Sequence, residues 1–197
     1  MEISDKEYFN HSNTYVQTLY TQEVIADKVK QIGQQITNDY KDTDEELIVI
    51  CLLKGGFMFT SDLVKNIKRD VIVDFMIVSS YGDSQVSSDN VIIKKDIGRE
   101  IKDKHVIIVD DIIDTGLTLH EITKLLMKRK PKSIKTCCLL NKEEKRTKNT
   151  IIDYYGFICP DKYVYGYGMD LKDHSRNLPY ICFIEPSICD NHSFLSS

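Results

Sequence analysis

The chain has 197 residues, of which 42% are hydrophobic and 28% charged, and its formal net charge is -4. This length and composition fit one domain with a core of its own. The slight negative charge gives no general attraction to nucleic acid or membrane surfaces, and no apolar run reaches membrane-spanning length.

Residues 1–20 are polar, have no clear period and do not resemble a signal peptide. Residues 21–40 are expected to form a helix, because apolar residues recur at helical spacing at Ile25, Val29, Ile32 and Ile36. The six cysteines lack metal-ligand spacing, and several lie in strand-like runs. They are typical of reduced core thiols in a cytoplasmic protein.

A first strand-to-helix crossing follows. Residues 47–53 are apolar throughout and predict a buried strand, Lys54-Gly55-Gly56 comes next, and residues 57–67 have a helical pattern. Glycines let a ligand approach the backbone closely. The sequence therefore predicts a possible phosphate site here, while Lys54 points either at a phosphate or only into solvent.

Residues 70–80 and 90–95 predict two further strands. The segment between them is rich in Ser, Gly and Asp, and is expected to be either a mobile loop or an ordinary surface hairpin. Residues 96–104 form a polar connection with a turn at Gly98.

The most informative stretch is 106–119. Four β-branched residues, Val106 to Val109, predict a strand buried on both faces, which runs into Asp110 and Asp111. A short loop then carries Asp114-Thr115-Gly116-Leu117-Thr118, and a helix follows that Thr118 or a close neighbour can cap.

A loop of this kind, between a parallel strand and a helix N-terminus, is a ready anion site. Carboxylates accept hydrogen bonds from sugar hydroxyls, and loop amides bind phosphate, so a sugar phosphate suits both. Magnesium would offset the crowded charge if pyrophosphate is also bound. The plainer interpretation is that the acids only end a strand and Thr118 caps a helix.

The rest of the chain continues the alternation. Strands are expected at 133–140 and 181–184. Between them lie the charged run 141–146, the apolar and aromatic segment 151–158 and the tyrosine-rich segment 161–170. The fold class is therefore α/β, with a central, mostly parallel sheet flanked by helices.

The stretch 106–119 resembles the phosphoribosyl-diphosphate (PRPP) motif of type I phosphoribosyltransferases, and the later segments narrow the resemblance to hypoxanthine-guanine phosphoribosyltransferases. The likeness runs from the first helix to the strand near Ile184. It implies the type I phosphoribosyltransferase fold as a single domain over 1–197. A small hood subdomain would come from the N-terminal segment and roughly 155–190.

The resemblance also implies how PRPP is bound. The ribose and 5'-phosphate sites would comprise Asp110, Asp111, Asp114, Thr115, Gly116, Leu117 and Thr118. Lys54, Gly55 and Arg176 would bind pyrophosphate, with Asp170 nearby, and the bond between Leu53 and Lys54 would be cis. The metal would be Mg²⁺, with Asp110, Asp111 and Asp170 as its expected ligands.

The base site is implied in the same way. Lys142 would face the purine's exocyclic oxygen, Tyr163 would stack on the ring, and the Val164 backbone and Asp170 would complete the purine site. Tyr163 stands where many relatives have Phe. Arg146 matches a further family arginine of unassigned role. Ser80 and Tyr81 would form the tip of a lid that excludes water.

The expected reaction is displacement of pyrophosphate from PRPP by a 6-oxopurine, hypoxanthine or guanine, with Asp114 as the catalytic acid/base. This is purine salvage by a cytoplasmic glycosyltransferase, expected as a homodimer or homotetramer that binds neither nucleic acid nor membrane. A xanthine-preferring enzyme and a nucleic-acid-binding regulator remain alternatives. A receiver domain is disfavoured because the paired acids come late in the chain, and Lys142 argues against adenine or orotate.

Overall fold

The computed structural model describes residues 16–80, 91–147 and 150–184. The helices are α2 (Gln22–Asp39), α3 (Phe57–Asn66), α4 (Leu117–Met127) and the short 3-10 helix η1 (Glu143–Lys145). The strands are β1 (Val16–Tyr20), β2 (Leu47–Leu53), β3 (Ile72–Ser80), β4 (Val91–Lys95), β5 (His105–Ile113), β6 (Ser133–Asn141), β7 (Tyr154–Ile158), β8 (Tyr163–Tyr165) and β9 (Ile181–Ile184).

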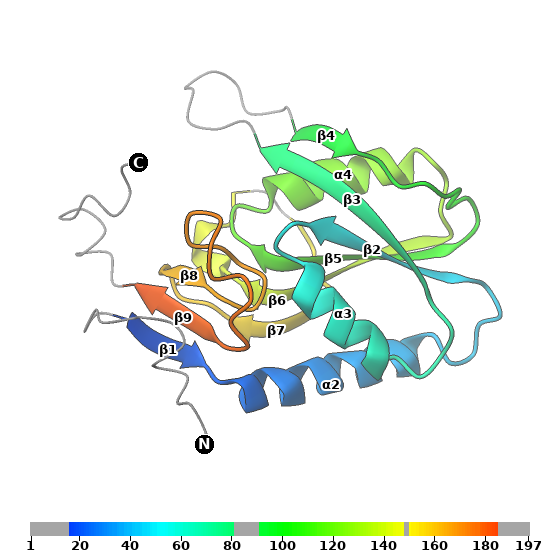
Figure 1. Cartoon of the computed structure of the whole chain (residues 1–197). Coiled ribbons are helices and arrows are strands. Elements are labelled where there is room, and N and C mark those ends of the chain that lie inside the picture. The colour runs from blue at the N-terminus through cyan, green and yellow to red at the C-terminus, as the bar shows by residue number, and fades with distance from the viewer. Residues whose placement is uncertain (1–15, 81–90, 148–149, 185–197) are drawn as a thin grey trace.

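The main sheet has six strands in the order β4-β3-β2-β5-β6-β7. Every pair is parallel except β3 with β4, so the expected α/β fold with a mostly parallel sheet is confirmed. Helices α2 and α3 cover one face and α4 covers the other (Figure 1). In the described part of the chain, no helix is both long and apolar enough to cross a membrane.

Strand alternation fills both faces of this sheet. In β5, Ile107 and Val109 belong to the core under α2 and α3, whereas Val106 and Ile108 belong to the core under α4. All four are fully buried, which explains why the strand is uniformly apolar. Cys137 and Cys138 divide between the two cores in the same way, as expected for adjacent residues of a strand.

Helix α2 begins one residue after Thr21, whose hydroxyl accepts a hydrogen bond from the Val24 amide at 3.4 Å. Strand β5 continues through the two acids to Ile113, because β6 stays paired with it as far as Asn141. The helix cap is Gly116, so Thr118 lies inside the first turn of α4 and does not cap it.

A second, three-stranded sheet has the order β1-β9-β8 and is antiparallel throughout. It lies beside the carboxyl ends of the parallel strands (Figure 1). Its strands come from near both ends of the described chain, the segments from which the sequence predicts a hood. The assignment of the whole chain as one domain with this hood stays a prediction.

The central position of β5 leads to a stability prediction. Replacing Ile108 with Ala should lower the free energy of unfolding by about 3 kcal/mol. The reason is that the Ile108 side chain is fully buried, so its truncation leaves a cavity in the core. Ile151→Ala is the matched control: its side chain is 77% exposed, and the change should cost less than about 0.5 kcal/mol. Urea denaturation measures both, and equal losses would contradict the packing described for β5.

Candidate active site

The candidate active site lies where the chain changes direction across the sheet. From β2 the chain passes through α3 to β3 on one side, and from β5 it passes through α4 to β6 on the other. Ligands of open α/β sheets bind outside the carboxyl ends of strands at such a switch point. The two loops that begin there are 54–56 and 114–116, the two that the sequence singled out.

Three segments far apart in the sequence meet at this point. A Cβ atom at Gly55 would overlap the carboxylate of Asp111, and one at Gly168 would overlap the Gly55 carbonyl oxygen. Gly168 also has φ of 103°, a conformation that side chains resist. The peptide bond between Leu53 and Lys54 is cis, as the resemblance implied. The backbone of 54–56 is therefore in close contact with both β5 and the segment after β8.

The paired carboxyl groups of β5 are in an unfavourable electrostatic environment. Burial, reinforced by the neighbouring Asp111, raises the pKa of Asp110 well above its ordinary value. Burial also raises the pKa of Asp111, although the charge of Arg176 partly opposes that shift. The Asp111 amide donates to the Asp110 carboxylate at 3.0 Å. Two ionised carboxylates here would be stabilised by hydroxyl donors or a cation.

The loop after β5 turns sharply into α4. Gly116 has φ of 79°, in the left-handed region, and no side chain caps the helix. Leu117 and Thr118 form the first turn, and the Thr115 hydroxyl accepts from the Leu117 amide at 3.4 Å. A helix N-terminus without a side-chain cap, next to a left-handed turn, favours an anion. That Asp114 to Thr118 bind the ribose and its 5'-phosphate stays a prediction.

The acid and the lysine expected at the base site both lie near enough to the buried Cys159 thiol to influence its pKa. The pKa of Cys159 is raised, first by burial; the charge of Lys142 lowers it and that of Asp114 raises it. Lys142 is only 7% exposed, and its ammonium lies 3.8 Å from the Asp161 carboxylate. One carboxylate oxygen of Asp114, Oδ1, is buried and has no hydrogen-bond partner among the residues that the structure describes. Such an oxygen has an unused capacity to accept a proton or hydrogen bond.

The residues expected at pyrophosphate form an ion-pair cluster. The Arg176 guanidinium lies 2.7 Å from Asp170 and 3.4 Å from Asp173, and it also donates to the Gly168 carbonyl at 2.9 Å. The Lys54 ammonium lies 3.0 Å from Asp173. Asp173 thus links both cations, a role that sequence reasoning missed. The recurrence of charged residues at 170, 173 and 176 was the available signal.

Two other predicted groups are placed less completely. The Tyr163 ring is 42% exposed and its hydroxyl donates to the Asp170 carbonyl at 3.2 Å, while Val164 is buried in β8. Ser80 ends β3. Tyr81, the other residue expected at the lid tip, lies outside the described residues.

The donor set suits a magnesium ion that is held in part by substrate. In residues 16–80, 91–147 and 150–184, no three acidic, histidine or cysteine side chains lie close enough together to hold a metal alone. Magnesium typically takes one or two carboxylates and completes its shell with phosphate oxygens and water. The raised pKa values of Asp110 and Asp111 fit such a cation. Asp170 is already engaged by Arg176 and the Asp173 amide.

Comparison with known proteins agrees with this geometry. The family model described as phosphoribosyl transferase domain matches residues 16–173. The hypoxanthine-guanine phosphoribosyltransferase of Aquifex aeolicus is 44% identical over 167 residues, which is 85% of this chain and 93% of that protein. The hypoxanthine phosphoribosyltransferase of Escherichia coli is 40% identical over 84% of this chain and 93% of its own length.

A solved structure is also similar to this chain in both fold and sequence. A crystal structure of a hypoxanthine phosphoribosyltransferase from Staphylococcus aureus superposes with a TM-score of 0.85 at 39% identity. The match covers 95% of this chain and 98% of that one. Sequence, fold and the arrangement of loops at the switch point lead to the same assignment. The chain belongs to the phosphoribosyltransferase family.

Proposed function

We propose that the protein transfers the 5-phosphoribosyl group of PRPP to hypoxanthine or guanine, giving IMP or GMP and pyrophosphate in purine salvage. The observation that carries the proposal is the contact of Gly55 with the Asp111 carboxylate and with Gly168. This contact brings the expected pyrophosphate, ribose and base segments to one point of the sheet edge. The names of relatives that are 40–44% identical support the same reaction.

The 5'-phosphate would bind to the loop from Asp114 to Thr118, at the N-terminus of α4. The left-handed turn at Gly116 directs the chain into the helix without a side-chain cap. The ribose hydroxyls would bind the carboxylates of Asp110 and Asp111. Magnesium, when bound, would neutralise charge between this carboxyl pair and the departing pyrophosphate.

Pyrophosphate would replace Asp173 as the partner of Lys54 and Arg176. In the structure both cations are paired with this exposed carboxylate. Exposed ion pairs are weak, so a polyanionic ligand displaces such a partner at little cost. The amide of Gly55 and the neighbouring Asp170 would complete the pyrophosphate site, with Asp170 oriented by Arg176.

The purine would lie between Asp114, Lys142 and the segment at β8. The ammonium of Lys142 has donors and no acceptor, which selects a 6-oxo over a 6-amino ring. Tyr163 would stack on the base and the Val164 backbone would contact its edge. In the displacement, a purine nitrogen bonds to the anomeric carbon as the carbon–oxygen bond to pyrophosphate breaks. Asp114 accepts or shares the proton at purine N7.

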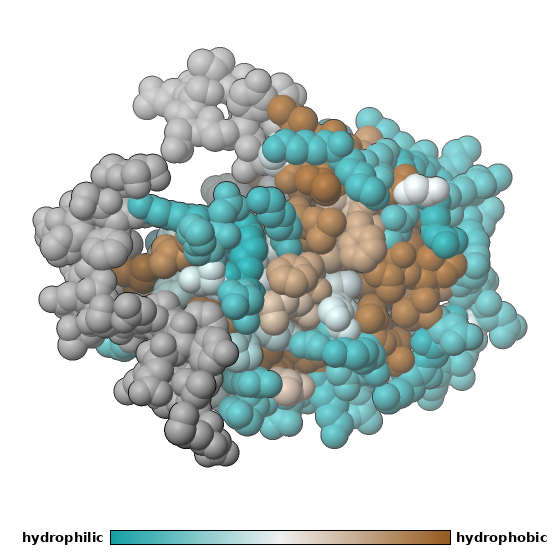
Figure 2. Space-filling model, viewed as in Figure 1, coloured by the Kyte–Doolittle hydropathy of each residue, from teal (hydrophilic) through white to brown (hydrophobic). Residues whose placement is uncertain are grey.

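The proposal extends to the surroundings of the site. Ser80 and Tyr81 would form a lid that excludes water from the reaction. The five cysteines within the described residues are buried and free, which is typical of a reducing cytoplasm. The protein would act as a homodimer or homotetramer. Figure 2 shows apolar surface over α3 and β3, and Phe57, Val73 and Phe75 on these elements are 36–41% exposed.

A xanthine preference and a regulatory role on this fold remain the alternatives.

The assay that tests the function offers the protein PRPP, magnesium and one base at a time. We expect nucleotide from hypoxanthine and guanine and none from adenine or orotate, because Lys142 presents only donors to the 6-position. Spectral change on nucleotide formation is the measurement. Faster turnover of xanthine would favour the xanthine alternative. Binding of PRPP without turnover of any base would contradict the proposed reaction.

Asp114→Asn tests the acid/base assignment. Turnover should fall by about 100-fold or more, because an amide cannot take the purine proton. The dissociation constant for PRPP should change much less, since the loop backbone is kept. Asp96→Asn removes a distant acid that pairs with Arg129 and serves as the control with unchanged turnover. Equal losses in turnover and PRPP binding would reject Asp114 as the base.

The carboxyl pair gives a prediction for stability against pH. A folded-state pKa raised above the unfolded value means that stability is greatest at acid pH and falls as pH rises through the raised value. Asp110→Asn removes this loss, so without ligand the variant should exceed the wild type by about 1 kcal/mol at neutral pH.

Asp39→Asn is the control of opposite sign. Hydrogen bonds from Lys135 and Tyr154 lower the pKa of Asp39, so its contribution to stability is present above the unfolded pKa and lost in acid. Urea denaturation from acid to neutral pH compares the variants. An Asp110→Asn protein that is less stable than the wild type at neutral pH would show that the pair is not destabilising.

A further inference from the structure

Arg146 is the one expected site residue whose role the sequence leaves unassigned, and the structure places it directly behind the phosphate loop. A Cβ atom at Gly116 would lie 2.8 Å from Cδ of Arg146 and 3.4 Å from its Nε. The Arg146 side chain therefore packs directly against the backbone of Gly116.

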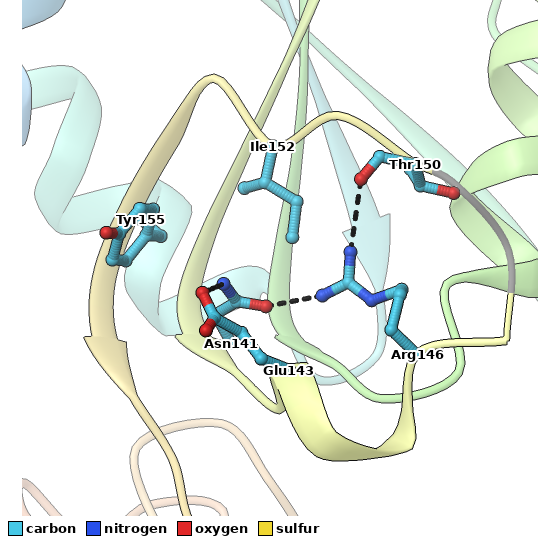
Figure 3. Close-up of a pocket in the computed structure, with 6 residues that line it drawn as sticks. All are labelled: Asn141, Glu143, Arg146, Thr150, Ile152 and Tyr155. Carbon is cyan, nitrogen blue, oxygen red and sulfur yellow. Dashed lines mark hydrogen bonds between the residues drawn. The ribbon is translucent and has the colours of Figure 1, made fainter.

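Two hydrogen bonds hold the guanidinium there. Nη1 donates to the Thr150 carbonyl at 3.2 Å, and Nη2 donates to the side-chain oxygen of Asn141. Asn141 is buried at the end of β6, and its amide nitrogen donates to Glu143 at 3.1 Å. Figure 3 shows these side chains lining one side of a pocket of about 320 Å³. The arginine is thus fixed to the sheet and does not extend freely into solvent.

The segment that carries Arg146 also orients the peptides of the loop. The Thr115 carbonyl accepts from the Thr147 amide at 3.1 Å, and the Gly116 carbonyl accepts from the Thr150 hydroxyl at 3.3 Å. In a trans peptide the N–H points opposite to the C=O. With these two carbonyls held at the back, the amides of Gly116 and Leu117 face the other way, toward the expected phosphate.

The charge of Arg146 adds to this orientation. Within the described ranges it forms no ion pair with any acidic side chain, and its buried Nε has no hydrogen-bond partner. An uncompensated, immobilised cation behind a ring of amides attracts an anion in front of them. The other cations of the site, Lys54, Lys142 and Arg176, are each paired with a carboxylate.

We propose that Arg146 is a positioning residue for the 5'-phosphate: it braces the Thr115–Gly116–Leu117 backbone from behind and supplies a positive charge to that subsite. The inference rests on the proposed function and assigns a role to a side chain that does not touch the substrate. If it is correct, loss of Arg146 weakens the binding of ligands that carry a 5'-phosphate. The binding of ligands without a 5'-phosphate is unaffected.

The test compares IMP with inosine, which differ only in the 5'-phosphate, as competitive ligands of the wild type and of Arg146→Met. We expect the variant to bind IMP at least about tenfold more weakly while inosine changes by less than about twofold. Arg146→Lys keeps the charge without the two-point brace and should be intermediate.

Arg129→Met is the matched control. Arg129 is bound to Asp96 just beyond the C-terminal end of α4, at the opposite end of the helix from Gly116, so its loss should leave both ligands unchanged. Circular dichroism checks that each variant folds. If Arg146→Met does not fold, Thr150→Val removes only the hydroxyl on the Gly116 carbonyl and should still lower the preference for IMP over inosine.

The outcomes distinguish a failure of the proposed function from a failure of the role assigned to Arg146. A wild type that binds IMP no better than inosine would contradict the proposed function itself. A wild type with a strong preference for IMP, kept in folded Arg146→Met, would overturn the role of Arg146 and leave the function standing. Equal weakening of both ligands would show a general structural role and would also overturn the inference.

Discussion

The structure depends on the burial of β5 on both faces and both edges. It pairs with β2 on one side and β6 on the other, while its alternate residues fill the two cores. A strand in this position has no freedom of register, because a shift of one residue would exchange its faces. Asp110 and Asp111 therefore have fixed positions beside the loop after β2. The burial that fixes them is the same burial that raises their pKa values.

The site combines opposing electrostatic features within one sheet edge. Acids that repel each other on β5 lie next to a helix N-terminus and a cluster of paired cations. Asp173 serves as a local partner for Lys54 and Arg176. The proposed substrate would improve each of these arrangements, because it brings hydroxyls, phosphates and a divalent cation together. On that proposal, the protein maintains groups whose best partners belong to the substrate.

Much of the fold was predictable from local pattern. Residues 47–53 form β2 as expected, because seven consecutive apolar residues with a following glycine loop favour a buried strand. The helix around Ile25 to Ile36 was predictable from its spacing. The end of β5 was not, since it depends on how far β6 remains paired with it. The cap of α4 was not either, because a left-handed glycine at 116 replaces a hydroxyl cap.

The sequence by itself determined which chemistry is available: the acids, the glycine loops and the lysine at fixed places along the chain, together with the family to which they belong. Only the tertiary structure decided how these groups act. Lys54 and Asp173 form an ion pair although they are 119 residues apart in the sequence. Arg146 is held next to Gly116 by hydrogen bonds from its guanidinium to Asn141 and to Thr150. The reason is physical. Periodicity and turn chemistry depend on neighbours in the chain, whereas the pKa of a carboxyl group and the direction of an amide depend on neighbours in space.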